Sequence, residues 1–402
     1  MTSFDEALKI LNSVKIKVKS ENIPLLDSLN RVSCRDVLSK LDLPTEDNSA
    51  MDGYALKSSL TQNITHGEEL KLEIEGGTIY AGDNSKKNIK EDKAIKIMTG
   101  GYLPDKLDAV LPLEDAKVIS GNLIITSPIG SNKNVRKKGE DIKRGDRILD
   151  KNTRLTPEAI ALLASCNIKK INVYEKIPVS IISTGNEILT LNQRFRYGRV
   201  FNSNGILAEL FLSQNGCSVV ENVVCKDNLT VIKNTISSAL KSSKIIITSA
   251  GASFGEKDFT EKALIESGLN IKFRQVAIKP AKPFSFGLFN NNVPVFMLPG
   301  NPMAFFTCLV VFLKPFIGNQ IDIKNSVLTA KSRSLFKYAK NHKRREFIPA
   351  YTYSKNGCFY SENYKKHGPA MISALGHINS VVSIPENTFE IEEDDYIDVY
   401  FI

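Results

Sequence analysis

Between Pro178 and Phe316 the chain alternates short apolar segments with helical ones, and this alternation constrains the fold more than any other feature. Residues 245–248 form a β-branched run that is typical of a buried strand. Residues 259–266 follow with helical spacing and end near Gly268, a residue suited to the position after a helix. Strands that alternate with helices predict a parallel sheet with helices on both faces and a ligand site at the carboxyl ends of the strands.

The same pattern assigns the other elements of this region. Asp227 is expected to cap the helix that reaches Leu240, and Asn301 to cap the helix that opens with Pro302. The further strands are expected at residues 179–183, 217–224, 269–278, 284–289 and 293–298, and the further helices at 206–212 and 303–312.

Three turns rich in small residues fall at the predicted carboxyl edge of this sheet: TGNE at 184–187, SAGASFGEKD at 249–258 and LPGNP at 298–302. Backbone N–H groups in such turns, and the helix N-termini beside them, bind anions. The charged residues nearby are Glu187, Asp227, Asp258, Lys279 and Lys282. Acidic and basic groups side by side suit a phosphate ligand with a divalent metal. The alternative is that the acids cap helices and the lysines are solvated.

The chain before residue 178 lacks this alternation. Ser3 and Glu6 form a capping box at the start of a helix, and Thr156 with Pro157 starts another that ends at Asn167. The rest is expected to be an amphipathic segment at 25–37, a polar loop at 43–55 that is dense in side-chain donors and acceptors, and short strands within 56–135.

The tail after residue 326 is predicted to be β-structure. Lys355-Asn356-Gly357 is a strong hairpin signal between two strands, and residues 381–384 and 396–402 add others. A small barrel or sandwich is therefore expected, with one dense basic cluster at 342–347 that is either an exposed loop or closes over an anion.

We therefore predict an α/β multidomain chain. The predicted parts are a helical and mixed N-terminal linking domain (1–45 and 136–176), an inserted β-rich domain (46–135), a parallel-sheet α/β domain (177–325) and a small C-terminal β-barrel (326–402).

Composition narrows the classes of function. The six cysteines form no CxxC pair and the four histidines no close pair, so a structural zinc site or a disulfide framework is not expected, and a reducing cytoplasm fits. No signal peptide is expected. The most apolar stretch, 293–317, is interrupted by prolines and Lys314 and is predicted too short to cross a membrane. The net charge of +9 favours anionic ligands, yet no nucleic-acid-binding pattern is found.

Eight motifs along almost the whole chain resemble one family in order. They are DNSAMDGYA (47–55), IMTG (97–100), VRKKGED (135–141), ISTGNE (182–187), SAGASFGEKD (249–258), IKPAKP (278–283), LPGNP (298–302) and RREF (344–347). This set resembles the molybdopterin molybdenumtransferases, the MoeA family that includes the gephyrin E domain.

The resemblance implies an elongated homodimer of four-domain subunits whose sheet domain is molybdopterin-binding-like. It implies insertion of molybdate into adenylylated molybdopterin with release of AMP and a requirement for Mg²⁺ or another divalent cation. It further implies a transient contact with the adenylyltransferase of the preceding step, a cytoplasmic location, and no nucleic-acid or membrane partner.

Carried over by position, the resemblance implies a set of site residues. The implied catalytic residues are Asp52, Thr99, Glu187, Asp227 and Asp258, of which the last three are implied metal ligands. The implied substrate- and oxyanion-binding residues are Arg136, Asp141, Ser249, Gly251, Ser253, Lys279, Lys282, Pro299, Pro302 and Arg344. Asp52 and Thr99 lie in the inserted domain, which in the family faces the active site of the partner subunit.

The chain departs from the family pattern at several of these motifs. Asn186 stands where the family has an aspartate, Ala281 where it has a glycine, and Pro369 where it has a serine expected to hold molybdate. Two alternatives follow. One is a dimeric scaffold with weak or no catalysis, and the other is a molybdopterin adenylyltransferase, which the sheet domain alone would resemble.

Overall fold

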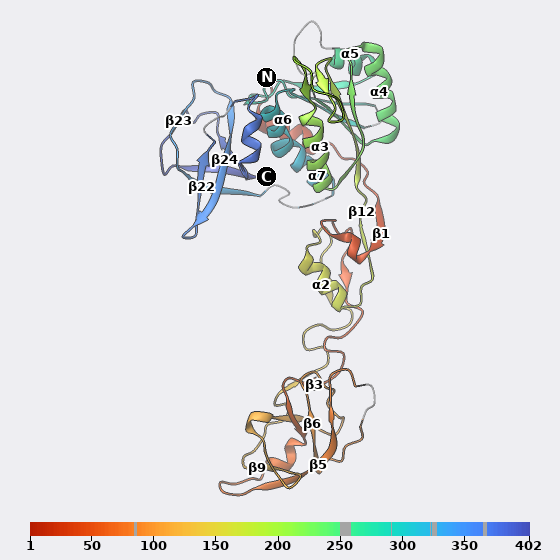
Figure 1. Ribbon diagram of the computed structural model, residues 1–402, viewed down its shortest axis with the longest axis vertical. Helices are drawn as coiled ribbons and strands as arrows, with labels where there is room; N and C mark the ends of the chain where they lie inside the picture. The colour runs from red at the N-terminus through yellow and green to blue at the C-terminus, as the bar shows by residue number, and fades with distance from the viewer. Residues whose placement is uncertain (84–86, 250–258, 291, 322, 324–327, 365–367) are drawn as a thin grey trace.

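The computed structural model describes residues 1–402 except 84–86, 250–258, 291, 322, 324–327 and 365–367. The molecule is elongated, with an α/β domain and a small barrel side by side at one end, a small mixed unit in the middle and a β-domain at the far end (Figure 1). The two connections to the middle unit run through strands β1 (Ser20–Pro24) and β12 (Lys170–Tyr174), which pair antiparallel with each other.

The α/β domain is built on a six-stranded sheet. Its order is β16 (Cys217–Cys225), β13 (Ile177–Thr184), β17 (Ile245–Ser249), β21 (Pro294–Leu298), β20 (Ser285–Leu288) and β18 (Asn270–Arg274). The first four strands are parallel and the last two are antiparallel additions. The predicted parallel sheet is therefore confirmed at its centre, while the antiparallel pairing of β20 with β21 and of β18 with β20 makes its other edge antiparallel.

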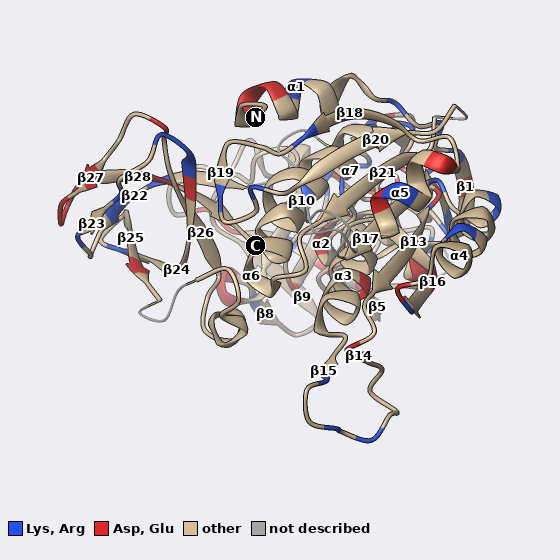
Figure 2. Ribbon diagram, turned by 90° about the horizontal axis from the view of Figure 1, so that it is seen from above, with Lys and Arg blue, Asp and Glu red and all other residues tan. Residues whose placement is uncertain are grey.

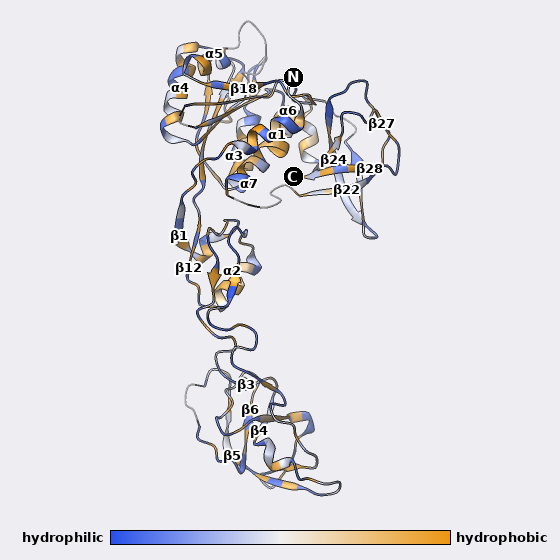
Figure 3. Cartoon of the chain, turned by 180° about the vertical axis from the view of Figure 1, so that it is seen from behind, coloured by the Kyte–Doolittle hydropathy of each residue, from blue (hydrophilic) through white to orange (hydrophobic). Residues whose placement is uncertain are grey.

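Helices cover both faces of this sheet, as predicted. The helices are α3 (Ser203–Gln214), α4 (Leu229–Ser242), α5 (Phe259–Glu266), α6 (Pro302–Cys308) and α7 (Lys314–Gln320). Helices α4 and α5 pack on one face around Ile232, Ile236 and Leu264. Helices α3, α6 and α7 pack on the other face. Figure 3 shows the mainly hydrophobic colouring of α6.

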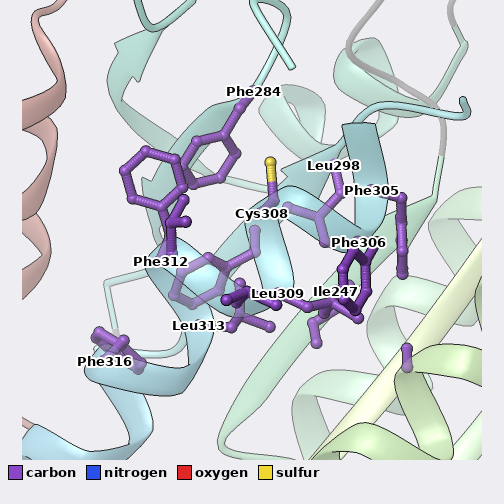
Figure 4. Close-up of a cluster of buried hydrophobic side chains, with 14 of the residues drawn as sticks. Ile247, Phe284, Leu298, Phe305, Phe306, Cys308, Leu309, Phe312, Leu313 and Phe316 are labelled. Carbon is purple, nitrogen blue, oxygen red and sulfur yellow. The ribbon is translucent and has the colours of Figure 1, made fainter. Parts of the chain in front are cut away.

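The central core is aromatic. The ring centroid of Phe284 lies 4.7 Å from that of Phe312 (Figure 4). The ring centroids of Phe296 and Phe316 lie 5.0 Å apart. Helix α1 (Phe4–Ser13) joins this core, because the ring of Phe4 lies 5.3 Å from Phe312 and 5.4 Å from Phe347 of the barrel. The N-terminal helix therefore fills the joint between the sheet domain and the barrel.

Helix α6, a π-helical turn (Leu309–Leu313) and α7 form one continuous helix. The prediction that Lys314 and Pro315 interrupt this stretch is wrong, because the π turn just before Pro315 lets the helix pass the proline. Residues 302–320 are long and apolar enough to cross a membrane by length and composition, and 78% of the most apolar window is buried inside the protein. In this structure it is the core helix of the sheet domain.

Residues 269–278 are not the single strand that was predicted. Strand β18 ends at Arg274, Gln275 adopts a positive φ of 59°, and β19 (Ile278–Lys279) then pairs with the barrel strand β24. The left-handed residue redirects the chain from the sheet to the barrel, which the apolar pattern alone does not reveal.

The C-terminal unit is a closed five-stranded barrel. The strands are β22 (Thr329–Ser334), β24 (Arg345–Lys355), β25 (Cys358–Asn363), β26 (Ser380–Ile384) and β28 (Tyr396–Phe401), with β23 (Tyr338–Ala339) and β27 (Glu390–Ile391) as a separate pair. The predicted hairpin is confirmed, since Asn356 and Gly357 both have positive φ between β24 and β25.

The middle unit holds helix α2 (Pro157–Ser165), which Thr156 caps through its side chain, together with β2 (Val37–Leu38) and β11 (Arg147–Leu149). The predicted amphipathic segment at 25–37 forms only a 3₁₀ turn at Leu25–Ser28. Leu25 packs there with Leu155 and Leu163, so burial and not helical periodicity explains its apolar residues.

The far domain is a six-stranded sheet, as the β-rich prediction requires. Its order is β7 (Ala109–Pro112), β4 (Gly53–Leu56), β6 (Lys93–Ile97), β5 (Leu70–Ile79), β9 (Asn122–Ile125) and β8 (Lys117–Ile119). Strands β3 (Asn48–Ser49) and β10 (Val135–Arg136) pair where the chain enters and leaves it.

Candidate functional site

A pocket with a volume of about 530 Å³ lies at the carboxyl edge of the parallel strands. We call it the Asn204 pocket. It is lined by Thr184, Glu187, Ile188, Val200, Phe201, Asn202, Ser203, Asn204, Ser249, Gly300, Pro302, Ala370 and Ile372. Two of the three predicted turns therefore meet here, through Glu187 and Gly300, and so does Ser249, the described start of the third.

Asn204 fixes the floor of this pocket. Its Nδ2 donates to Ser249 Oγ at 2.9 Å and to the carbonyl oxygen of Gly300 at 2.8 Å. Because a carbonyl only accepts, the second bond fixes the amide orientation. The opposite atom, Oδ1, is buried and has no hydrogen-bond partner among the described residues.

Asn202 stands beside it as the N-cap of α3. Its Oδ1 accepts from Gly205 N and from Ser183 Oγ, each at 3.0 Å. Neither asparagine was among the predicted site residues, because the helix was expected to start at Ile206. The Asn-Ser-Asn run at 202–204 is the N-cap signal that could have revealed them.

The TGNE turn carries the predicted acid Glu187 two residues after Gly185. Gly185 has a φ of 155°, a conformation that favours glycine, and its missing side chain leaves room for the Glu187 carboxylate, which a Cβ at this position would meet at 2.8 Å. Glu187 is exposed at the mouth of the pocket.

Asp227 faces this turn from the end of β16. Its Oδ2 accepts from Asn186 N at 3.1 Å, and Asn186 Oδ1 accepts from Asp227 N at 3.4 Å. The prediction that Asp227 caps α4 is wrong, since the cap is Asn228, whose Oδ1 accepts from Val231 N at 3.0 Å. The carboxylate of Asp227 is thereby left at the turn, close to the residue where the family pattern has a second acid.

A second, smaller pocket of about 290 Å³ lies between the sheet domain and the barrel, and we call it the Lys279 pocket. It is lined by Lys279, Pro280, Met303, Tyr338, Glu346, Phe347, Ile348, Pro349, Gly368 and Pro369. The carbonyl of Pro369 accepts from Met303 N at 3.0 Å, and the next residue, Ala370, lines the Asn204 pocket. One short segment therefore separates the two pockets.

Lys279 has a buried acid as its neighbour. Its Nζ lies 2.8 Å from Glu346 Oε1, which also accepts from the Tyr338 hydroxyl at 2.8 Å. The Lys279 side chain is 42% exposed and that of Glu346 only 5%. Burial and the bond to Glu346 raise the pKa of Tyr338 well above its ordinary value. The tyrosine is therefore neutral and donates to the carboxylate.

Three other predicted residues lie on the same side of the molecule. Lys282 is exposed on the turn after Lys279, and Arg344 is half-buried and donates from Nη1 to the Ile278 carbonyl at 3.3 Å. Pro299 is buried within the LPGNP turn, behind Pro302 at the start of α6. The departure Ala281 adopts a positive φ of 79°, the conformation for which a glycine is suited.

Asp52 and Thr99 form a unit in the far domain. Asp52 Oδ1 accepts from both the backbone N and the Oγ1 of Thr99, each at 2.7 Å. These two bonds lower the pKa of the Asp52 carboxyl below its ordinary value. The pair lies at the opposite end of the molecule from the two pockets (Figure 1).

Arg136 and Asp141 lie between these regions and are both exposed. Arg136 is in β10 opposite Asn48, and Asp141 N donates to the Leu43 carbonyl at 3.1 Å. Within a single chain, Arg136 and Asp141 therefore line neither the Asn204 pocket nor the Lys279 pocket. Gly251, Ser253 and Asp258 lie outside the described residues.

Comparison with known proteins covers the whole chain. Residues 2–167 match the family described as MoeA N-terminal region (domain I and II), 180–319 the probable molybdopterin binding domain, and 331–402 the MoeA C-terminal region (domain IV). A molybdopterin molybdenumtransferase of Haemophilus influenzae is 33% identical over 321 residues, which are 79% of this chain and 77% of that protein. One of Staphylococcus epidermidis is 29% identical over 401 residues, covering 99% and 94%.

The solved structures agree. A molybdopterin biosynthesis MoeA protein of Pyrococcus horikosii superposes with a TM-score of 0.85 and 27% identity, covering 100% of this chain and 99% of that one. The chain therefore belongs to the molybdopterin molybdenumtransferase (MoeA) family of transferases, which acts in molybdenum cofactor biosynthesis.

Proposed function

We propose that this protein inserts molybdate into adenylylated molybdopterin, releasing AMP, in the cytoplasm and with a divalent cation such as Mg²⁺. The observation that carries the proposal is the pair of pockets divided by residues 368–372. A pterin-sized pocket at the carboxyl edge of a parallel sheet adjoins a smaller one that holds a half-exposed lysine. Two such adjoining pockets would suit an organic ligand and an inorganic oxyanion on neighbouring sites.

The proposed oxyanion site rests on cations. Molybdate is a dianion, and Lys279 lines the smaller pocket, while Lys282 and Arg344 lie close to Lys279 on the following turn and just before β24. Charge-assisted hydrogen bonds are roughly twice as strong as neutral ones, so these groups can hold a dianion without the hydroxyl that Pro369 lacks. The reacting atoms come from molybdate and from the dithiolate of the substrate, so no nucleophilic side chain is required.

The larger pocket would hold the pterin. Asn204 Oδ1 is an acceptor without a partner among the described residues, and Val200, Phe201 and Ile372 supply apolar wall. A bicyclic ligand with N–H groups on one edge suits this combination.

The proposed metal fits the donors at the TGNE turn. Mg²⁺ is usually held by one or two carboxylates together with substrate phosphates, and the described acids there are Glu187 and Asp227. No cluster of three or more metal-binding side chains occurs within the described ranges, so the phosphates would complete the set. When bound, the ion would supply Lewis-acid stabilisation of the departing phosphate.

We further propose a homodimer with composite sites. Asp52 and Thr99 form an exposed hydrogen-bonded unit at one end of an elongated chain, while both pockets lie at the other. If the unit acts in catalysis, it must reach the pockets of a second copy. The adenylyltransferase of the preceding step is the proposed transient partner, since it would deliver the adenylylated substrate.

A dimeric scaffold without catalysis is the second candidate, and Pro369 is the residue that favours it. Both are tested by incubating the protein with adenylylated molybdopterin, molybdate and Mg²⁺ and measuring molybdenum cofactor. We expect cofactor to form with the wild type. Mixed dimers of Asp52→Asn and Asp227→Asn chains should recover up to a quarter to a half of that activity, whereas each variant alone should be inactive. Absence of cofactor with folded wild type would favour the scaffold.

A further inference from the structure

A buried carboxylate borders the proposed oxyanion site. Among the described residues that line the Lys279 pocket, Glu346 is the only acid. Strand β19 runs beside the barrel strand β24, with Lys279 opposite Glu346 (Figure 2). A negative charge at this place repels an oxyanion and competes with it for the Lys279 ammonium. The affinity of the site for an oxyanion therefore depends on what else compensates the charge of Glu346.

The second oxygen of this carboxylate faces a histidine outside the pocket. Glu346 Oε1 has Lys279 and Tyr338 as neighbours, whereas Oε2 lies 3.3 Å from His342 Nε2. The His342 side chain is only 18% exposed. Both facing atoms are buried without a hydrogen-bond partner among the described residues, so the distance is short but the geometry is poor for a hydrogen bond. A positive charge on the imidazole would be strongly stabilised at this contact.

A backbone contact fixes the tautomer of His342. The N–H group of Arg344 donates to His342 Nδ1 at 3.4 Å. Because Nδ1 accepts, the neutral imidazole carries its proton on Nε2, the atom that faces Glu346. Protonation at Nδ1 breaks the bond from Arg344 N, leaves Nε2–H beside the carboxylate and adds a full positive charge there.

The surroundings of His342 keep it neutral at pH 7. Burial lowers the pKa of His342 below its ordinary value, and three neighbouring cations lower it further, while Glu346 raises it. His342 therefore becomes cationic only as the pH falls through this lowered pKa. The charged and titratable groups on the elements around it are Lys279 in β19, Tyr338 in β23, Lys340 after β23, Arg344, Arg345 and Glu346 at the start of β24, and Glu386 after β26.

We propose that His342 is a positioning residue of the oxyanion site, which acts through Glu346 and sets how the affinity for the oxyanion changes with pH. The inference rests on the proposed function, which puts molybdate at Lys279. While His342 is neutral, Glu346 holds the Lys279 ammonium. When His342 is protonated, it compensates the charge of Glu346 and leaves the ammonium to the oxyanion.

The affinity for a dianionic oxyanion should therefore rise as the pH falls through the pKa of His342. Charges of +1 and −2 at roughly 9 Å, with the dielectric constant of water, change the Kd by about fivefold. By linkage, the bound oxyanion must raise the pKa of His342, and the size of that rise must match the fold-change in Kd. A histidine with a merely structural role would show neither effect.

The experiment measures sulfate and molybdate binding to the full-length protein by isothermal titration calorimetry, at fixed ionic strength, between about pH 5 and pH 8. Sulfate stays a dianion throughout this range, so its affinity reports on the protein. The test variant is His342→Gln, whose amide keeps an N–H donor near Glu346 but does not titrate. The matched control is His66→Gln, which removes an exposed histidine from the far domain. We expect the wild type and the control to gain about fivefold in affinity toward low pH, and the test variant less than about twofold.

A second readout follows the histidine itself. The chain has four histidines, so the His342 ring signals can be followed by NMR in protein with labelled histidine and assigned by single substitutions. Molybdate should raise the pKa of His342 in the wild type. Glu346→Gln should lower it, because the Glu346 carboxylate raises it. In the Glu346→Gln background, adding His342→Gln should leave molybdate affinity unchanged, because the carboxylate through which His342 acts is gone.

The failure of this inference can be told apart from failure of the proposed function. The same pH dependence of affinity in the wild type and in His342→Gln would overturn the role of His342, while oxyanion binding at Lys279 and cofactor formation could stand. A His342 pKa that molybdate leaves unchanged would overturn that role too, and this titration of the wild type decides even if the variant does not fold. Absence of both sulfate and molybdate binding would instead overturn the oxyanion site together with the role of His342.

Discussion

The substitution Glu346→Gln should tighten molybdate binding. Glu346 Oε1 lies 2.8 Å from Lys279 Nζ, so an oxyanion on the far side of that ammonium would lie roughly 5–6 Å from the carboxylate. At the dielectric constant of water, charges of −1 and −2 at about 5.5 Å repel by about 1.5 kcal/mol. Because about 1.4 kcal/mol corresponds to tenfold in Kd, we expect an affinity gain of about tenfold or more.

The cost of this substitution in stability should be small. Glutamine retains an oxygen that can accept from the Tyr338 hydroxyl, and Lys279 is 42% exposed and can be hydrated when its partner is neutralised. We expect the free energy of unfolding to fall by about 1 kcal/mol or less. Denaturant titration checks that the variant is folded before binding is measured.

Molybdate titration by calorimetry at fixed ionic strength provides the assay. Glu386→Gln is the matched control, because it removes one carboxylate from the same barrel but one that is paired with Arg345, at 3.1 Å. Lys279→Met should weaken binding about tenfold or more. If Glu346→Gln binds molybdate no more tightly than the wild type and Glu386→Gln, the oxyanion does not bind at Lys279.

Three further predictions follow from single contacts. Thr99→Val should raise the pKa of Asp52 toward its ordinary value in an NMR titration, because it removes the hydroxyl donor. Because the pKa of Asp52 is lowered in the folded protein, the stabilisation from its carboxylate is present above the ordinary pKa of an aspartate and is lost as the pH falls through the folded pKa. The same Asp52 pKa in Thr99→Val as in the wild type would contradict this account. Asn228→Ala should destabilise the protein by about 1 kcal/mol and Asp227→Ala by clearly less, and the reverse order in thermal unfolding would refute the assignment of the cap. Pro369→Ser should improve molybdate affinity by less than Lys279→Met weakens it, and a larger gain would show that a hydroxyl dominates that site.

The sequence predicted the architecture well where the pattern was strong. The β-branched run at 245–248 became the buried strand β17, and Lys355-Asn356-Gly357 became a hairpin turn with two positive φ values. Both signals are local: a run of β-branched apolar residues in the first case, and residues that tolerate a positive φ in the second. Each can therefore be recognised without knowledge of the tertiary packing.

Other features depended on contacts that a sequence does not show. The break at Gln275 depends on a left-handed residue that sends the chain to the barrel, and the segment at 25–37 owes its apolar residues to packing in the middle unit. Asp227 does not cap helix α4, because its carboxylate accepts a hydrogen bond from Asn186 N across the turn, and the neighbouring Asn228 caps the helix instead. In each case a long-range or neighbouring contact outweighed the local propensity.

The candidate site was predicted in part. The resemblance named Glu187, Ser249 and Pro302, and the structure gathers these in one pocket, while it separates Lys279 into another. Asn204 was not predicted as a site residue because the helix was expected to start at Ile206, and its bond to the Gly300 carbonyl, 96 residues away in the chain, is not visible in the sequence. Glu346, the partner of Lys279, was not predicted as a site residue either, because the two residues lie far apart in the chain and their contact is not visible in the sequence.

The most direct measurement of the central claim is the ratio of AMP released to molybdenum inserted in a single turnover. The protein, in excess over adenylylated molybdopterin, would be mixed with Mg²⁺ with and without molybdate, and AMP and molybdenum cofactor would both be quantified. The account predicts one AMP for each molybdenum inserted and little AMP without molybdate. AMP release at the same rate without molybdate, with no cofactor formed when molybdate is present, would contradict it.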